Sequence, residues 1–393
     1  MLWLDKDELE EWALAQAENV AELPYLATNV AIMPDSHQWY GVPIWCVFGT
    51  RSAIVPNAVW VDIWCWMVFA RTKVKADSLS KDQYSALRLH VLATVPVWFH
   101  HNASPNDIPT ELIHTFNQYK ERLEIVSNNE LLVANTIGTL WGGNHFIELQ
   151  EDQEGYLCVM IHSGSRQLWK IVADHYIKIA NANAEANFHP ELAKQDLWYL
   201  LANSEAGLNY IAEHNYLLEF AKRNRRMIMD KVLDAIYHQL GEFEVFNLDD
   251  WRPYIIDCCH NFVSLEHHFG KNVYVHRKWA VKTSENGMYV IPGSMWDVSF
   301  VLKWLGSNSK VAMNSCSHWA GRKMSRTKAQ QELDLDATIR SLDEQWIVHW
   351  VTDKANLDEA PGAYKDINEV IANEMDIVGS IELMLKPLVS IKW

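Results

Sequence analysis

The stretch GTLWGGNHFIELQEDQEGYLCVMIHSGSR, residues 138–166, indicates the fold more clearly than any other part of the chain. It lies in a block that we expect to form strands from Leu131 to His162, with a turn at Gly142-Gly143. The longest helical region follows, from about Gln167 to Gln239, where apolar residues recur at spacings of three and four. This order predicts a sheet with long helices packed beside it.

The flanking sequence adds further short strands and helices around this block. We expect strands at Thr28–Met33, Val42–Phe48, Ala58–Asp62 and within Tyr254–Val290, and helices at Lys6–Glu18, Lys81–Val95 and Glu111–Glu124. No repeat, low-complexity tract or linker interrupts the chain. We therefore predict an α+β fold in which residues 1–393 form one domain, with a central mixed β core and a helical insertion at about residues 167–240.

The chain has the composition of a globular protein, with 49% hydrophobic and 21% charged residues. A formal net charge of −16 argues against nonspecific coating of nucleic acid, because phosphate binding needs Lys and Arg at the contact face. Any contact with a polynucleotide is then confined to local basic patches, although such patches are more often solvated surfaces. The candidates are Lys222, Arg223, Arg225 and Arg226, then Arg277 and Lys278, then Arg322, Lys323, Arg326 and Lys328.

The six cysteines contain no CxxC pair, and no secretory leader is recognisable at the N-terminus. This usage favours a reducing compartment, so we expect a cytoplasmic protein. The longest apolar runs fall short of the roughly 20 residues that cross a bilayer, so no membrane span is expected.

Several candidate metal ligands stand beside the expected strands. Asp62 and Cys65, three residues apart, offer a hard oxygen and a soft sulfur donor, and His145, His162 and His260 each adjoin Gly, Asn or Ser. Together these donors are typical of a site for manganese, iron or zinc. Each residue alone also fits a simpler role, as a buried cysteine, an N-capping aspartate or a core histidine, and the spacing leaves both readings open.

A candidate nucleophile, His318, lies in the run NSCSHWAGRK at residues 314–323. Small neighbours let backbone N–H groups approach a phosphate, and Arg322 can neutralise it, so the histidine can accept a phosphoryl group. Ser294 and Ser299 in PGSMWDVS suit phosphate or ribose hydroxyls in the same way. No Walker A loop, kinase glycine loop or GxSxG elbow offers a competing account.

Nine motifs occur in the order found in the RtcB-type RNA ligases, and the chain resembles that family from about Met33 to Lys392. The motifs are MPDSHQ (33–38), VDIWCWM (61–67), GGNHFIE (142–148), HSGSR (162–166), HNFVSLE (260–266), HRK (276–278), IPGSM (291–295), SCSHWAGR (315–322) and DEAPGAYK (358–365).

The resemblance implies two Mn²⁺ ions and GTP as cofactors. Cys65 would bridge the two ions, with Asp62 and His145 completing one shell and His162 and His260 the other. His318 would be the residue that becomes guanylylated, with Arg322 near the phosphates. The nucleotide-binding residues implied are Asn144, His145, Glu148, His260, Asn261, Pro292, Gly293, Ser294, Met295, Ser299, Ala320, Gly321, Arg322, Tyr364 and Lys392.

The implied function is an RNA ligase of tRNA splicing or RNA repair. Neutral His318 would attack the α-phosphate of GTP and release pyrophosphate, and GMP would then pass to an RNA 3′-phosphate. A 2′,3′-cyclic phosphate end would first be opened, and a 5′-hydroxyl end would finally displace GMP. The partners implied are such RNA ends and GTP, with room for an activating protein.

The 19 tryptophans outnumber the 16 glycines. By the resemblance, glycine is expected where this chain has Trp at 39, 45, 60, 64, 66, 141, 169, 279, 296, 304, 319, 346, 350 and 393. Ordinary aromatic substitution does not explain why the tryptophans fall one by one on these glycines. A degenerate relative would also have lost ligands, yet all remain, so we favour UGA codons that the source organism reads as glycine.

Two rival functions stay open at this level. A metal-dependent phosphatase or cyclic phosphodiesterase would use the same ions without a covalent GMP. A noncatalytic protein that binds RNA ends is expected if the tryptophans are genuine, because an indole supplies neither positive φ nor room for a ligand.

Overall fold

The computed structural model describes residues 11–34, 36, 41–59, 65–97, 100–102, 104–186, 192, 194–240, 255–285, 287–304 and 308–392. Within these ranges the helices are α1 (Glu11–Ala21), α2 (Lys81–Thr94), α3 (Thr110–Tyr119), α4 (Glu124–Ser127), α5 (Glu130–Thr136), α6 (Leu168–Ala186), α8 (Glu205–Leu240), α9 (Arg326–Glu332), α10 (Leu335–Glu344), α11 (Ile367–Asn373) and α12 (Met375–Val378). Short 3₁₀ segments are η2 (Pro56–Val59), η3 (Ala76–Ser78), η4 (Lys120–Arg122), η5 (Asn308–Lys310), η6 (Lys354–Glu359) and η7 (Pro361–Ala363).

A seven-stranded sheet forms the centre of the fold. Its order is β12 (Met288–Pro292), β13 (Ser299–Lys303), β15 (Ser380–Ile391), β5 (Phe146–Asp152), β6 (Tyr156–Ser163), β4 (Trp66–Lys75) and β8 (Ile255–Cys259). All of its strand pairs are antiparallel. The two edge strands, β8 and β12, contact each other, so the sheet nearly closes on itself.

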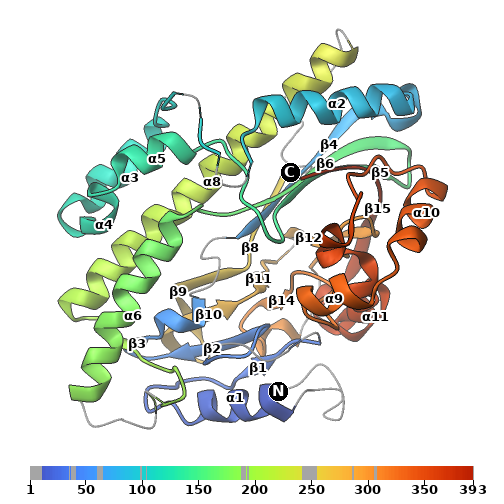
Figure 1. Ribbon diagram of the computed structural model, residues 1–393. Coiled ribbons are helices and arrows are strands. Elements are labelled where there is room, and N and C mark those ends of the chain that lie inside the picture. The colour runs from blue at the N-terminus through green and yellow to red at the C-terminus, as the bar shows by residue number, and fades with distance from the viewer. Residues whose placement is uncertain are drawn as a thin grey trace.

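A second sheet lies beside the first and contributes the other wall of the core (Figure 1). It contains β1 (Ala31–Ile32), β2 (Cys46–Thr50), β10 (Lys271–Lys278) and β9 (Asn261–His268), in that order. Two small pairs complete the strands: β11 (Ala280–Lys282) with β14 (Ser315–Ser317), and β3 (Ala53–Ile54) with β7 (Leu200–Leu201).

Strands β4, β5 and β6 are buried on both faces because their side chains alternate between two cores. Met67 and Phe69 pack in one apolar cluster, whereas Val68 and Ala70 pack in another that includes α2 and α8. This period of two is the one that a strand imposes. Both faces are therefore covered, and only the strand ends are left to build a site.

The long helix α8 runs diagonally across the molecule, with α6 beside it and α2, α3 and α5 on its outer side (Figure 1). The C-terminal helices α9 to α11 gather on the other side of the central sheet. The prediction of an α+β fold is confirmed. Parallel neighbours occur in the described residues only at the isolated bridges Val97↔Leu140 and Val348↔Val389, so the mixture of strand directions is slight.

Most predicted helices are found, including the long helical region, which forms α6 and α8. The helix predicted at Lys81–Val95 corresponds to α2, where Ser80 and Gln83 form a capping box. The helix predicted at Lys6–Glu18 is α1, which ends later, at Ala21, and its first residues lie outside the described part of the chain. Whether residues 167–240 are an insertion in one domain stays a prediction.

Three strand predictions were wrong in detail. The block said to begin at Leu131 opens with helix α5, because ELLVANT holds good helix formers and buries Val133 and Ala134. Ala58 and Val59, the first residues of the strand expected at Ala58–Asp62, lie in the 3₁₀ segment η2, which starts at Pro56, and residues 60–62 lie outside the described part of the chain. The strand expected from Val42 begins only at Cys46, and it follows a residue with positive φ, Trp45. No described helix is both long and apolar enough to cross a membrane.

Candidate active site

Four of the predicted metal ligands lie at the ends of adjacent strands, on the same side of the central sheet. In an antiparallel sheet the start of one strand lies beside the end of its neighbour. Cys65 directly precedes β4, and His145 directly precedes β5. His162 is near the end of β6, and His260 directly follows β8. All four side chains are at most 1% exposed.

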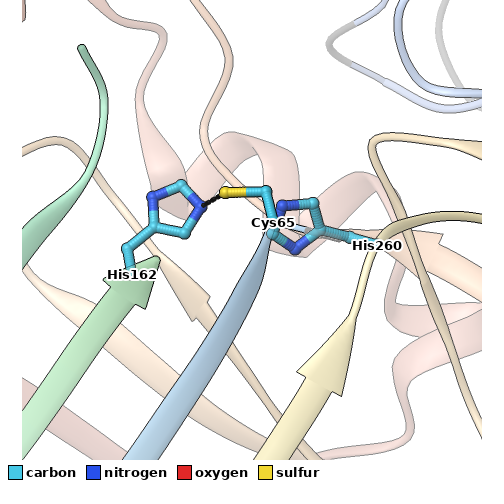
Figure 2. Close-up of side chains that lie close together, drawn as sticks. All are labelled: Cys65, His162 and His260. Atoms are coloured by element: carbon cyan, nitrogen blue, oxygen red, sulfur yellow. Dashed lines mark hydrogen bonds between the residues drawn. The ribbon is translucent and has the colours of Figure 1, made fainter. Parts of the chain in front are cut away.

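The donor atoms of these side chains converge on Cys65. Its Sγ lies 2.7 Å from Nε2 of His162 and 3.1 Å from Nε2 of His145. One ligand atom from each of Cys65, His162 and His260 lies within 4.8 Å of the others, and Figure 2 shows the three side chains meeting at the strand ends. A thiolate with two imidazoles is a donor set suited to a transition-metal ion.

A hydrogen bond to the backbone orients the imidazole ring of His162. Nδ1 of His162 lies 2.9 Å from the carbonyl oxygen of Asn144, so an N–H at Nδ1 leaves the Nε2 lone pair facing the sulfur. Neither ring nitrogen of buried His260 has a hydrogen-bond partner among the described residues. An unpartnered buried imidazole is costly, and a bound cation would satisfy it. The residues present therefore fit a metal ion.

The predicted nucleophile, His318, is fully buried beside this cluster. Its ring centroid is 3.8 Å from that of His260 and 6.2 Å from that of His162. Burial, with a smaller contribution from His162, holds the pKa of His318 well below its ordinary value, so the imidazole is neutral near pH 7. Its Nε2 has no hydrogen-bond partner among the described residues, which is what a nucleophilic nitrogen needs.

Two groups compete for Nδ1 of His318. The carbonyl oxygen of Trp279 lies 3.1 Å away and can only accept, so it favours a proton on Nδ1 and a lone pair on Nε2. The indole Nε1 of Trp45 lies 3.2 Å away and can only donate, so it favours the opposite tautomer. The indole therefore opposes the tautomer in which Nε2 is a nucleophile.

Glu148 and Ser299, both predicted to bind the nucleotide, lie on neighbouring parts of the central sheet and share a contact. The side-chain amide of Gln150 donates to Glu148 at 2.7 Å and to Ser299 at 3.1 Å. Burial raises the pKa of Glu148 to about 8, in spite of hydrogen bonds from Trp296 N–H and Gln150. This carboxyl group is thus poised to hydrogen-bond a polar ligand in a dry site.

Arg322 and Tyr364 meet around the buried carboxylate of Glu359. Arg322 donates to Glu359 at 3.1 Å and to the hydroxyl of Tyr364 at 2.7 Å, and Tyr364 donates to Glu359. Arg326 contacts the same carboxylate at 2.6 Å. Burial lowers the pKa of Lys392 to about 8, and Glu359 counteracts this. The two arginines are therefore held by protein carboxylates rather than presented openly to a phosphate.

The other predicted nucleotide-binding residues lie near these groups. Asn144 directly precedes His145, its side-chain nitrogen has no partner within the described part of the chain, and Asn261 directly follows His260. Pro292 ends β12, Gly293, Ser294 and Met295 lie in the turn that leads to β13, and Ala320 and Gly321 lie between His318 and Arg322. Asp62 lies outside the described residues.

Four tryptophans have backbone conformations that side chains rarely adopt. Nine described non-glycine residues have positive φ, and four of them are Trp45 (58°), Trp279 (60°), Trp296 (69°) and Trp346 (62°). All four belong to the fourteen positions where the family resemblance implies glycine. Each costs on the order of 1–3 kcal/mol that glycine would avoid.

The tryptophans also crowd the predicted nucleotide-binding residues. The Trp319 ring stacks on Tyr364, with centroids 5.2 Å apart, and Trp45 and Trp279 contact His318. The ring of Trp350 lies 5.7 Å from the ammonium of Lys392. An indole thus stands beside three of the groups that would contact GTP.

The basic patches predicted from sequence are largely neutralised within the fold. Arg225 is fully buried and pairs with Asp257, and Arg277 is buried against Glu266. Arg223 pairs with Glu219 and Glu111. The Arg223–Glu219 pair, four residues apart on one helix, is visible in the sequence, whereas Asp257, Glu266 and Glu111 are not evident as partners because they lie farther away in the chain.

Three functional candidates were missed by sequence reasoning. Gln150 links Glu148 to Ser299, and Glu359 lies in the quoted motif DEAPGAYK, which offered a signal. Glu374 accepts hydrogen bonds from the backbone N–H and hydroxyl of Ser317, the residue before His318. Nothing in the local sequence around Glu374 indicates that role.

Comparisons with known proteins agree over the whole chain. A family model described as tRNA-splicing ligase RtcB matches residues 16–393. The RNA-splicing ligase RtcB of Escherichia coli strain K12 is 32% identical over 402 residues, covering 100% of this chain and 96% of the relative. The tRNA-splicing ligase RtcB of Nanoarchaeum equitans is 27% identical, with 98% and 92% covered, and an RNA-splicing ligase RtcB homolog of Entamoeba dispar is 30% identical, with 96% and 81% covered.

Proposed function

The chain belongs to the tRNA-splicing ligase RtcB family, and we propose that it is an RNA ligase that acts through a covalent GMP adduct on His318. The observation that carries this proposal is the placement of His318. A neutral, fully buried imidazole, whose Nε2 has no hydrogen-bond partner among the described residues, lies against His260, which clusters with Cys65 and His162. This arrangement supports the assignment of His318 as a nucleophile that works beside a metal-binding donor set.

In the proposed reaction the lone pair on Nε2 attacks the α-phosphorus of GTP. The N–P bond forms, the bond to the β-phosphate oxygen breaks, and pyrophosphate leaves. An oxygen of an RNA 3′-phosphate then attacks the same phosphorus and releases His318. Finally a 5′-hydroxyl loses its proton, attacks the activated 3′-phosphorus and displaces GMP. An end with a 2′,3′-cyclic phosphate is first opened by water.

We assign the metal ligands on chemical grounds. Cys65, His162 and His260 would hold one ion, and His145 would join Cys65 at a second. A divalent ion such as Mn²⁺ supplies charge that polarises the phosphates beside His318. The carbonyl of Asn144 orients the imidazole of His162, and the carbonyl of Trp279 favours the nucleophilic tautomer of His318.

We further propose that glycine occupies the fourteen tryptophan positions in the natural protein, through UGA codons read as glycine. Positive φ at four of them and the crowding of Tyr364, Lys392 and His318 support this. The same crowding favours a second candidate if the tryptophans are genuine, a noncatalytic protein that binds RNA ends. Below, the chain with glycine at all fourteen positions is called the glycine form.

A joining assay tests the proposed reaction. The glycine form is incubated with GTP, Mn²⁺ and two RNA strands, one ending in a 3′-phosphate and the other starting with a 5′-hydroxyl. We expect a joined product that needs GTP and does not form with a 3′-hydroxyl strand. Loss of the 3′-phosphate without joining would instead identify a phosphatase. In a parallel reaction with a strand that ends in a 2′,3′-cyclic phosphate, opening of the ring without joining would identify a phosphodiesterase.

A further inference from the structure

The helix α8 carries two adjacent buried polar side chains, Asn224 and Arg225, in a run that sequence reasoning assigned to a basic surface. Both are 0% exposed. A buried amide beside a buried guanidinium is expensive unless each is hydrogen-bonded, so their partners show what the pair does.

Asn224 connects two loops that flank the candidate metal ligands. Its Oδ1 accepts from the backbone N–H groups of Gly138 and Thr139, at 2.8 and 3.0 Å. Its Nδ2 donates to the hydroxyl of Ser163 at 3.1 Å and to the carbonyl of Gly164 at 3.2 Å. The first loop leads toward His145, and the second directly follows His162.

Arg225 connects the second loop to β8, which lies on the far side of β4 from β6 in the central sheet. Its NH1 donates to the carbonyl of Ser163 at 3.3 Å, and its NH2 donates to Asp257 at 2.9 Å. Asp257 lies on β8, three residues before His260. One helix face therefore ties the end of β6, which carries His162, to the strand that leads to His260.

We propose that Asn224 and Arg225 are positioning residues that set the spacing of His162 and His260 for metal binding. The inference rests on the proposed function, because it concerns the same metal site. The two side chains act through the groups just described: backbone atoms of both loops, the Ser163 hydroxyl and the Asp257 carboxylate. Two ligands on separate strands need such a tie, because small displacements of metal-bound side chains weaken binding strongly.

The test is the absorption spectrum of the full chain titrated with Co²⁺, which reports a thiolate ligand by a charge-transfer band and the coordination geometry by its visible bands. Arg225→Lys keeps the charge but loses the forked contact with Ser163 and Asp257. Asn224→Asp keeps an oxygen that accepts from the Gly138 N–H but replaces the amide group that donates to the Gly164 carbonyl with a second oxygen. Arg226→Lys is the matched control, because Arg226 is the next residue and pairs with Asp230 at 3.5 Å on the solvent-exposed side of α8.

We expect Arg225→Lys and Asn224→Asp to weaken Co²⁺ binding at least tenfold and to change the visible bands, while Arg226→Lys matches the unsubstituted chain. Unchanged affinity and spectrum in folded Arg225→Lys and Asn224→Asp proteins would overturn the inference. Should either variant fail to fold, Asp257→Asn decides, because Asp257 is partly exposed. Asp257→Asn should weaken Co²⁺ binding, and unchanged Co²⁺ binding would refute the proposal that these contacts set the spacing of His162 and His260. If the unsubstituted chain gives no thiolate band, the metal site itself is wrong and the inference falls with it.

Discussion

At the scale of single residues, the hydrogen bonds at Nδ1 decide whether His318 can act as a nucleophile. The Trp279 carbonyl and the Trp45 indole require opposite tautomers, and both lie within 3.2 Å of the same nitrogen. A neutral imidazole carries one ring proton, so in either tautomer only one of these two groups can form a hydrogen bond with Nδ1. The residue at position 45 therefore affects the tautomer of His318 as well as the space around it.

Trp45→Phe removes the indole N–H while keeping an aromatic ring at the same backbone position. We expect the tautomer ratio of His318 to shift toward the form with the proton on Nδ1, because the Trp279 carbonyl is then the one remaining Nδ1 partner among the described residues. One hydrogen bond of about 0.5–1.5 kcal/mol corresponds to a shift of up to roughly tenfold in the tautomer ratio. Nitrogen NMR of histidine-labelled protein measures this ratio, with Trp169→Phe in a different apolar cluster as the control. An unchanged ratio in Trp45→Phe would contradict the assignment.

At the scale of elements, the buried carboxyl of Glu374 holds the strand β14 that ends just before His318. Ser317 donates to it through the backbone N–H at 3.0 Å and through the hydroxyl at 2.8 Å. Burial raises the pKa of Glu374 from 4.5 to about 7, although the Ser317 hydrogen bonds lower it. The folded chain therefore keeps a proton there that the unfolded chain has lost.

This shift predicts a specific pH dependence of stability. Because the folded state binds more protons between pH 4.5 and about 7, the contribution of Glu374 to stability decreases as pH rises through that window and then levels off. Glu374→Gln mimics the protonated form and should remove this decrease, on the order of 3 kcal/mol between pH 5 and pH 8. Urea unfolding at several pH values checks it, with Glu369→Gln on the exposed side of α11 as the control. Equal pH dependence in Glu374→Gln and the unsubstituted chain would show that the carboxyl is ionised throughout.

The elements that sequence predicts well are those with strong local signals. Helix α2 has its capping box and a periodic apolar face, and the strands around β5 and β6 follow from their composition. The strand expected from Val42 was misplaced, because Trp45 adopts a positive φ that its residue type does not suggest. Local patterns do not carry such information, since the backbone there is fixed by distant contacts.

Sequence predicted the metal-ligand candidates and His318, but it did not predict the polar contacts that hold the residues around them. Cys65, His145, His162, His260 and His318 follow from motifs, and the structure brings them together. Asn224 was missed, because its partners Ser163 and Gly138 lie 61 and 86 residues away in the chain. Arg225 and Arg322 were taken as surface or phosphate-facing cations, yet the carboxylates of Asp257 and Glu359 engage them. Long-range polar contacts are what the sequence does not show.

At the scale of the whole molecule, the tryptophans affect the proposed metal site and the proposed nucleotide site differently. The ligand atoms of Cys65, His162 and His260 converge with indoles present, whereas Tyr364 and Lys392 have an indole against them. We therefore expect the chain with tryptophan to bind Co²⁺ or Mn²⁺ but to bind GTP much more weakly than the glycine form. Calorimetric titration of both forms with GTP measures the difference. Equal GTP affinity would mean that the indoles move aside easily.

The gene and its native product test the glycine proposal directly. We expect UGA codons at the fourteen positions and a mass from the source organism that fits glycine at each of them. A UGG codon at Trp319 or a native peptide containing tryptophan there would refute the decoding explanation and favour a noncatalytic relative.

The most direct test of the central claim is the transfer of label from α-³²P-labelled GTP to the glycine form in the presence of Mn²⁺. The account predicts a covalent adduct that is labile in acid, as an N–P bond is, and that is absent from His318→Ala and His318→Asn, whose chains still bind metal. A label that persists in those variants, or no label on the folded, metal-loaded glycine form, would contradict it.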